Sequence, residues 1–208
     1  MIIKFIQKHF YTLLLVPYVV GIIGMLLPVS RDFFMSLTPV MLLFSFVLVV
    51  TEESKWMKFN ALPLVFICIC GFAVEYIGVN YGYLFGDYQY GTTLGPKVYG
   101  VPLTIAMNWA MLCIASRSLV NLVTNKAVMA SLLAAAIVTA YDVLLEPVAI
   151  RFMWWWWDGV NVPIFNYICW FVFSFFFQLW FRKVPKVTGR SYWMILVHAI
   201  FYWILLLM

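Results

Sequence analysis

The chain has 208 residues, of which 66% are hydrophobic and only 10% carry a charged side chain. A soluble domain normally has about 25% charged and under about 50% apolar residues, so the composition excludes an ordinary water-soluble domain and indicates a chain that lies in lipid. The net charge of +5 requires no nucleic-acid partner, because membrane orientation explains basic residues beside apolar spans.

Seven apolar runs are long enough to cross a hydrocarbon core about 30 Å thick. In chain order they cover residues 11–28, 34–51, 61–79, 102–123, 127–148, 162–181 and 190–208. The first run is too long for the core of a cleavable signal and lacks a small-residue cleavage pattern, so we expect it to be the first span. The predicted fold is all-α, a polytopic integral membrane protein with about seven transmembrane helices in one bundle. No composition shift marks a second domain, so residues 1–208 are expected to form a single transmembrane domain.

Basic side chains near the span ends predict the orientation, because they gather on the cytoplasmic face. In a seven-span chain, only Arg31, Lys97 and Arg151 fall on one side. Nine fall on the other side: Lys4, Lys8, Lys55, Lys58, Lys126, Arg182, Lys183, Lys186 and Arg190. The sequence therefore predicts a multi-pass protein of the cell inner (plasma) membrane with a cytoplasmic N-terminus.

Two links between the spans are long, residues 80–101 and 149–161, and both face outside in this topology. The stretch 78–102 holds six of the eleven glycines and five of the twelve tyrosines. Glycine permits tight turns, and non-helical backbone at membrane depth is tolerated only against protein or water. We therefore expect residues 78–102 to fold back as a lid, and the two loops to cap a polar pocket.

Acidic side chains gather on the outer half of the predicted bundle. Glu75 lies in the last turns of the third span, Asp142 and Glu146 share one helix face in the fifth, and Asp87 and Asp158 lie in the outer loops. An ionisable group within a span costs about 2.5 to 3.5 kcal/mol on insertion scales and usually faces the bundle interior. Burial and the negative end of a helix disfavour a charged carboxyl, so the three span acids are candidates to be neutral and to donate a proton.

A structural role for these acids is the alternative, since they could hydrogen-bond across helices to Asn108, Asn166 or tyrosine hydroxyls and lock the bundle. Glu146 is followed by Pro147, which cannot donate to the carbonyl of Val143. We expect the helix end to open there and to form part of a pocket wall.

The tryptophan run at 154–157 also has two interpretations. Ring faces attract cations, but tryptophan gathers at membrane interfaces, and we expect Trp154 to Trp156 to form such a belt. Trp157 and Trp170 stay site candidates because of their neighbours in the sequence.

Neither cysteine nor histidine suggests a metal site. The sequence has only His9 and His198, too few for the histidine clusters that bind iron or zinc, so the histidine-rich di-iron membrane oxygenases and most metal hydrolases are excluded. The cysteines lie within predicted spans and are expected to pack as small apolar residues: Cys68, Cys70, Cys113 and Cys169.

Four sequence blocks in a fixed order carry a family resemblance. They read EYIGVNYGYLFGDYQY at 75–90, LGPKVYGVP at 94–102 with NW at 108–109, DVLLEP at 142–147, and WDGVNVPIFNYICW at 157–170. This pattern, spread over residues 60 to 182, resembles the carotenoid biosynthesis membrane proteins of the CruF type.

The resemblance implies a cofactor-independent carotenoid hydratase, which adds water across the terminal isopropylidene double bond of a carotenoid such as lycopene, γ-carotene or a C50 precursor. A carboxylic acid would protonate the alkene, aromatic faces would stabilise the tertiary carbocation, and a second carboxylate would act on the water. The expected partners are the carotenoid within the bilayer, membrane lipids and other carotenoid biosynthesis enzymes. The candidate catalytic residues are Glu75, Asp87, Asp142 and Glu146. The candidate substrate-binding residues are Tyr76, Tyr88, Asn108, Trp109, Tyr141, Trp157, Asn166 and Trp170.

Three other functions remain open at this point. A carotenoid end-group cyclase also begins with alkene protonation but then excludes water. A proton-coupled small transporter would use the span acids as relay sites, although the acids cluster at one face instead of ranging across the bilayer. A non-catalytic carotenoid-binding membrane protein would use the same pocket.

Overall fold

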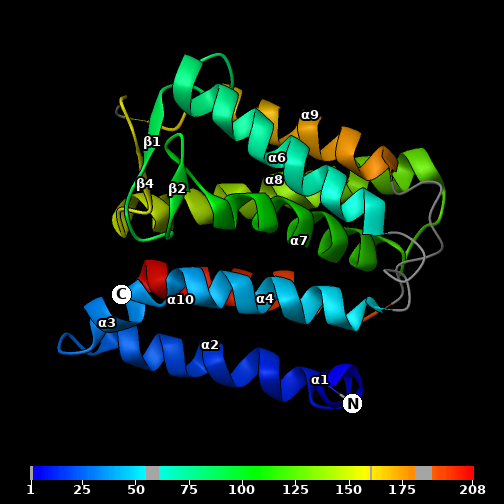
Figure 1. The fold of residues 1–208 in the computed structure, drawn as a ribbon, viewed down its shortest axis with the longest axis horizontal. Coiled ribbons are helices and arrows are strands. Elements are labelled where there is room, and N and C mark those ends of the chain that lie inside the picture. Colours follow the sequence, from blue (N-terminus) through cyan, green and yellow to red (C-terminus); the bar gives the residue numbers. More distant parts are fainter. Residues whose placement is uncertain (1, 55–60, 160, 181–188) are drawn as a thin grey trace.

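The computed structural model describes residues 2–54, 61–159, 161–180 and 189–208. A helix covers most of each predicted span (Figure 1). The helices are α1 (Ile2–Lys8), α2 (Phe10–Leu26), α3 (Arg31–Ser36), α4 (Thr38–Glu52), α6 (Ala61–Tyr81), α7 (Leu103–Val120), α8 (Ala127–Arg151), α9 (Ile164–Trp180) and α10 (Trp193–Leu207). The N- and C-termini lie at opposite ends of the bundle.

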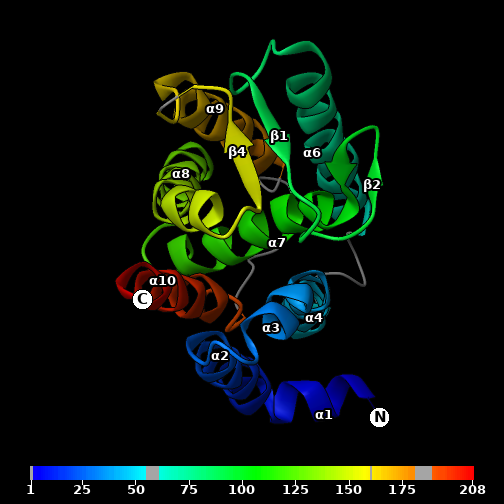
Figure 2. The same cartoon turned by 90° about the vertical axis from the view of Figure 1, so that its left-hand side faces the viewer.

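Helix α7 occupies the centre of the bundle (Figure 2). It packs against α4, α6, α8, α9 and α10, and 78% of its residues are buried. Pro102 caps its N-terminus in an extended conformation, a position where the missing N–H of proline costs no helical hydrogen bond. The other helices surround α7 and expose apolar side chains outward.

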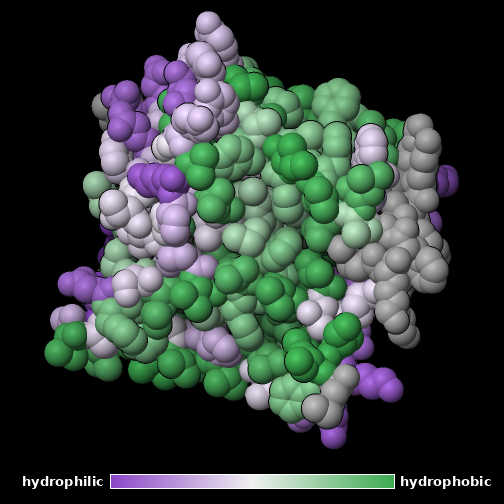
Figure 3. Space-filling model, in the orientation of Figure 1, coloured by the Kyte–Doolittle hydropathy of each residue, from purple (hydrophilic) through white to green (hydrophobic). Residues whose placement is uncertain are grey.

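These outward faces support a membrane protein. Within the described residues, α6, α7 and α8 are long and apolar enough to cross a membrane, and α1 with α2, bent by 70°, forms a fourth candidate span. Helices α4, α9 and α10 are apolar but shorter. Figure 3 shows apolar side chains over the middle of one face and polar ones gathered towards its ends, as expected for a chain embedded in a bilayer.

Short strands add a feature that the all-α prediction lacks. Strand β1 (Tyr88–Tyr90) pairs antiparallel with β4 (Trp155–Trp157), and β2 (Lys97–Val98) pairs antiparallel with β3 (Val101–Pro102). The first pair joins the two long loops over one end of the bundle, so the loops hydrogen-bond to each other.

Two helices run further than predicted. Helix α6 continues to Tyr81 and α8 to Arg151, so Pro147 lies inside α8 and does not open its end. Pro147 and Val143 are both exposed, and neither lines the cavity described below. The helix is therefore not opened at Pro147 as expected, although Leu145 and Glu146 just before it do line the cavity.

Candidate functional site

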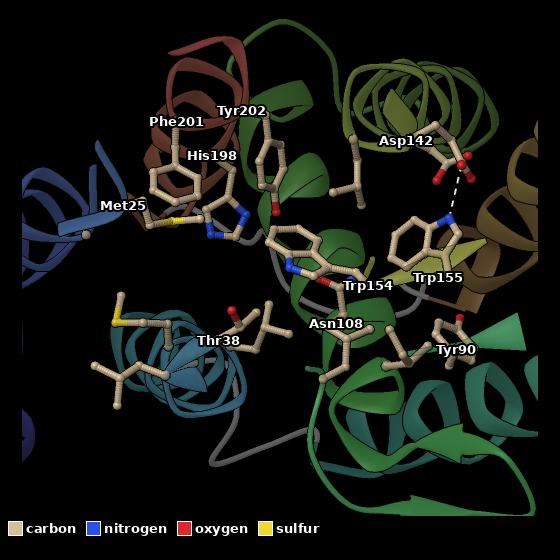
Figure 4. A pocket seen from close by; sticks show the side chains of 18 of the residues that line it. Met25, Thr38, Tyr90, Asn108, Asp142, Trp154, Trp155, His198, Phe201 and Tyr202 are labelled. Carbon is tan, nitrogen blue, oxygen red and sulfur yellow. Dashed lines mark hydrogen bonds between the residues drawn. The ribbon is translucent and has the colours of Figure 1, made fainter. Parts of the chain in front are cut away.

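A cavity of about 240 Å³ lies inside the bundle, lined by residues of α2, α3, α4, α6, α7, α8, α9 and α10 and of both strands β1 and β4. Figure 4 shows Met25 and Phe201 at one end and Asp142, Trp155 and Tyr90 at the other. Most of its wall is apolar, and its charged lining residues are all acids: Glu75, Asp142 and Glu146.

The apolar end of the cavity reaches the outer surface of the bundle. Val20 and Gly21 of α2 line it, and Val20 is 48% exposed on a helix whose exposed residues, apart from Thr12, are apolar or aromatic. An apolar helix that faces outward therefore borders the end of the cavity opposite the acids.

Glu75 is held by three hydrogen-bond donors. Tyr88 Oη and Tyr90 Oη donate to its Oε2 at 2.5 and 2.7 Å, and Trp109 Nε1 donates to its Oε1 at 2.9 Å. The side chain is 2% exposed. Donors from β1 and α7 thus converge on one carboxyl of α6, which fastens the loop after α6 to the bundle core.

Asp142 and Glu146 lie one helical turn apart on α8 and share Asn166 of α9. Asn166 Nδ2 donates to Asp142 Oδ2 at 2.8 Å and lies 3.4 Å from Glu146 Oε1. Trp155 Nε1 and Trp157 Nε1 of β4 donate to Glu146 Oε2 at 3.0 and 2.9 Å. Strand β4 presents both indoles to Glu146 because alternate residues of a strand face the same side.

Two polar atoms of the cavity residues have no hydrogen-bond partner among the described residues. They are Asp142 Oδ1 and Trp154 Nε1, and both are buried. Buried polar atoms in proteins are nearly always hydrogen-bonded to protein or water. The unpartnered N–H donor and the unpartnered carboxyl oxygen therefore leave two hydrogen-bonding positions that a small polar molecule such as water can fill.

Tyr88 and Tyr90 connect the lid to this chemistry. Burial first, and then the negative charge of Glu75, raise the pKa of both phenols well above the usual 10.0. Both hydroxyls therefore stay protonated at neutral pH and remain donors. Gln89, which stands between them in β1, faces away from the cavity, while Phe85 and Leu94 of the same loop also line it.

Aromatic rings line the acid end. The ring centroids of Trp109 and Trp170 lie 4.0 Å apart in a stacked arrangement, and those of Tyr88 and Trp157 lie 5.1 Å apart. The faces of such rings attract cations. Tyr88, Trp157 and Trp170 line the cavity directly, so a positive charge that forms there lies among π faces.

A second polar group lies on the side of the cavity away from Asp142 and Tyr90 (Figure 4). Tyr18 Oη hydrogen-bonds to Ser45 Oγ at 2.7 Å and to His198 Nε2, while Tyr141 Oη bonds to His198 Nδ1 at 2.8 Å and to Tyr202 Oη at 2.9 Å. These contacts join α2, α4, α8 and α10. Of this group only Tyr141 was a predicted site residue, because contacts between four separate helices leave no local signal in the sequence.

The structure brings most of the predicted site residues together. Glu75, Asp142 and Glu146 line the cavity with Tyr88, Asn108, Trp157, Asn166 and Trp170. Trp109 contacts it through Glu75. Tyr141 is buried and bonds to His198 and Tyr202, but it is not a lining residue. Tyr90 and Trp155 were not predicted, although each stands two residues from a predicted partner in its strand.

The structure places two candidate site residues, Asp87 and Tyr76, away from the cavity, and it leaves only part of the predicted tryptophan belt exposed. Asp87 is exposed and lies outside the cavity, because Tyr88 and Tyr90 take the inward positions of β1. Tyr76 also lies outside the cavity and packs against Tyr81 and Tyr99. The interfacial belt fits Trp156, which is 36% exposed, but Trp154 and Trp155 are buried at 5% and 6%.

Among the described residues, no three His, Cys, Asp or Glu side chains are grouped so that they could hold a metal ion.

The comparison that decides the family is a match between residues 33–208 and the family model described as carotenoid biosynthesis protein. The chain belongs to the carotenoid biosynthesis protein family. The matched region includes every residue of the acid cluster and the lid. Neither the search of curated proteins nor that of solved structures gave a match.

Proposed function

We propose that this member of the carotenoid biosynthesis family is a carotenoid hydratase. The observation that carries the proposal is the cavity: it begins beside lipid-facing α2, is apolar along most of its length, and ends at three buried carboxyls. A long polyene would enter from the bilayer and place only its terminal double bond at the acids.

The chemistry follows from what lies at that end. Protonation of the less substituted alkene carbon by a carboxyl leaves a tertiary carbocation, which the π faces of Tyr88, Trp157 and Trp170 and the remaining carboxylates stabilise. Water then adds to the cation and gives a tertiary alcohol. These steps involve no change of redox state in the protein, so the proposal assigns no cofactor.

The unpartnered atoms favour hydration over cyclisation. A water molecule needs both donors and acceptors, and buried water typically makes about three hydrogen bonds. The N–H of Trp154 and the Oδ1 of Asp142 each leave one hydrogen bond that a buried water can complete. A cyclase, by contrast, must keep water away from the cation.

The proposed arrangement in the membrane has seven spans in one domain of residues 1–208, a cytoplasmic N-terminus and the plasma membrane as its location. The loops 80–101 and 149–161 would then cap the acid cluster on the outer side. The two termini lie at opposite ends of the bundle, and this arrangement supports an odd number of membrane crossings. Other carotenoid biosynthesis enzymes are the proposed neighbours, since their products are equally lipid-soluble.

The test is expression in cells that accumulate lycopene, followed by mass spectrometry of the pigments. A hydratase yields a product heavier by one water molecule, and a cyclase yields an isomer of unchanged mass. Unchanged pigment from well-expressed protein, with lycopene, γ-carotene and a C50 precursor each supplied, would contradict both activities and favour a binding or transport role.

A further inference from the structure

The three carboxyls of the cavity differ in how many donors hold them. Glu75 receives three hydrogen bonds, two on Oε2 and one on Oε1. Indole N–H groups are donors only, so the contact from Trp109 requires an acceptor oxygen. Three donors around one buried carboxyl stabilise its charged form.

Glu146 is held in the same way by groups that cannot accept a proton from it. Trp155 and Trp157 both donate indole N–H groups to Oε2, and the Asn166 amide lies against Oε1. A proton on Oε2 would face two N–H groups, so the arrangement favours the carboxylate. Glu146 therefore suits a fixed negative charge.

Asp142 is different, because only Oδ2 receives a donor and Oδ1 has no partner among the described residues. The side chain is 0% exposed and lines the same cavity as Glu75 and Glu146. A third negative charge beside two others, on an oxygen without a donor, is the least favourable arrangement available. A proton on Oδ1 removes that cost and turns the atom into a donor that faces the substrate space.

We propose that Asp142 is the catalytic acid of the proposed hydratase, and that Glu75 and Glu146 stay ionised and stabilise the carbocation. This assignment rests on the proposed function. The sequence alone gives no reason to assign different roles to the three carboxyls. Their hydrogen-bond partners differ, and the proposed roles follow from that difference.

The proposed cycle balances within the cavity. The π pair of the terminal double bond takes the proton from Asp142 Oδ1 and forms a C–H bond at the less substituted carbon, while the O–H electron pair stays on the carboxylate. A lone pair of water forms the C–O bond at the tertiary carbon. The proton that this water loses returns to Asp142, so the acid is regenerated and the net change is alkene plus water to alcohol.

The first experiment compares product formation by the wild type and by Asp142→Asn, Glu75→Gln and Glu146→Gln in polyene-producing cells, normalised to the amount of folded protein. General acid catalysis contributes about 10²- to 10⁴-fold, so we expect Asp142→Asn to lose at least about 100-fold and to be the most impaired of the three. If Asp142→Asn does not accumulate, Asp142→Ser replaces it, since its hydroxyl can still accept from Asn166 but is not an acid.

The second experiment separates an acid from a structural residue. A dimethylamino isoprenoid, cationic at neutral pH, imitates the tertiary cation, and its binding to purified protein in lipid nanodiscs is measured by calorimetry. We expect Asp142→Asn to bind this amine within about threefold of the wild type, and Glu75→Gln and Glu146→Gln to bind it at least about tenfold more weakly, because each loses a negative charge near the cation.

Two outcomes overturn the assignment while leaving the hydratase in place. One is an Asp142→Asn chain that retains more than a tenth of the product while a glutamate variant loses it. The other is an Asp142→Asn chain whose amine binding falls as far as its turnover, which would mark a structural residue. A wild-type chain that hydrates none of the polyenes contradicts the proposed function itself, and is recognised because all four chains then give the same pigments.

Discussion

At the residue scale, Glu146 depends on the indole N–H groups of its neighbours. Replacing Trp157 by Phe removes one of its two indole donors but keeps an aromatic ring beside Tyr88. A hydrogen bond to a charged group contributes about 1.5 to 3 kcal/mol, so we expect Trp157→Phe to lower turnover by about tenfold or more with little change in expression. The measurement is the initial rate of product formation by purified protein in lipid.

The matched control for this variant lies next to it in the same strand. Trp156 faces away from the cavity and is 36% exposed, so Trp156→Phe is expected to leave the rate unchanged. Equal effects of the two substitutions would mean that the strand as a whole, and not the donor to Glu146, determines the rate.

At the element scale, the pairing of β1 with β4 holds the lid in place. Gly91 N donates to Trp154 O at 2.7 Å, and a Cβ at Gly91 would lie 2.0 Å from the carbonyl oxygen of Met153. Backbone cannot yield there as a side chain would, so Gly91→Ala must push the end of β1 away from β4. We expect a loss of stability of about 1 to 3 kcal/mol and a lid that leaves Tyr90 out of reach of Glu75.

Limited proteolysis after Lys97 in detergent-solubilised protein measures that loosening. Gly91→Ala should be cut at least several-fold faster than the wild type, and Gly159→Ala, where the added Cβ meets no heavy atom closer than 3.8 Å, should be cut at the wild-type rate. Equal cutting of all three chains would contradict a lid that depends on this strand pair.

At the scale of the whole molecule, the proposed seven-span topology predicts which loops face outside. In intact cells, a membrane-impermeant maleimide should label Gly159→Cys and should label Val123→Cys only after the cells are opened. The native cysteines should contribute little labelling, because Cys113 and Cys169 are buried and Cys68 and Cys70 are half-buried in α6. The reverse labelling pattern would invert the proposed orientation.

The helices could be predicted because an apolar run long enough to cross a membrane is a local property of the sequence. The site could not be predicted from local sequence in the same way. Strand β1 pairs residues 88–90 with residues 155–157, and the register of that pairing leaves no local signal in the sequence. Register decides that Tyr90 and Trp155 reach the acids while Asp87 and Trp156 face outward. The resemblance supplied the acids in the correct blocks, but only the contacts distinguish Asp142 from Glu75 and Glu146.

The proposed entry of the substrate from the bilayer would be a property of the assembled bundle, because segments far apart in the chain line the cavity. Gly21 lines its α2 end, where the proposed opening lies, and a Cβ there would have Phe201 Cε2 as its nearest neighbour at 3.8 Å. Gly21→Ala therefore fits and is expected to be fully active, while Gly21→Leu extends into the opening. Glycine within a helix costs about 0.8 to 1 kcal/mol relative to alanine, so neither variant should be less stable.

We expect Gly21→Leu to lower the rate with a long polyene by about tenfold or more, measured in lipid vesicles loaded with carotenoid. Val19→Leu is the control, since Val19 is 52% exposed on the same helix and does not line the cavity. A short water-dispersed isoprenoid that enters by another route would keep its rate in both variants. Full activity of Gly21→Leu on the long polyene would exclude the opening beside α2 as the entrance and would leave the lid side as the route to the acids.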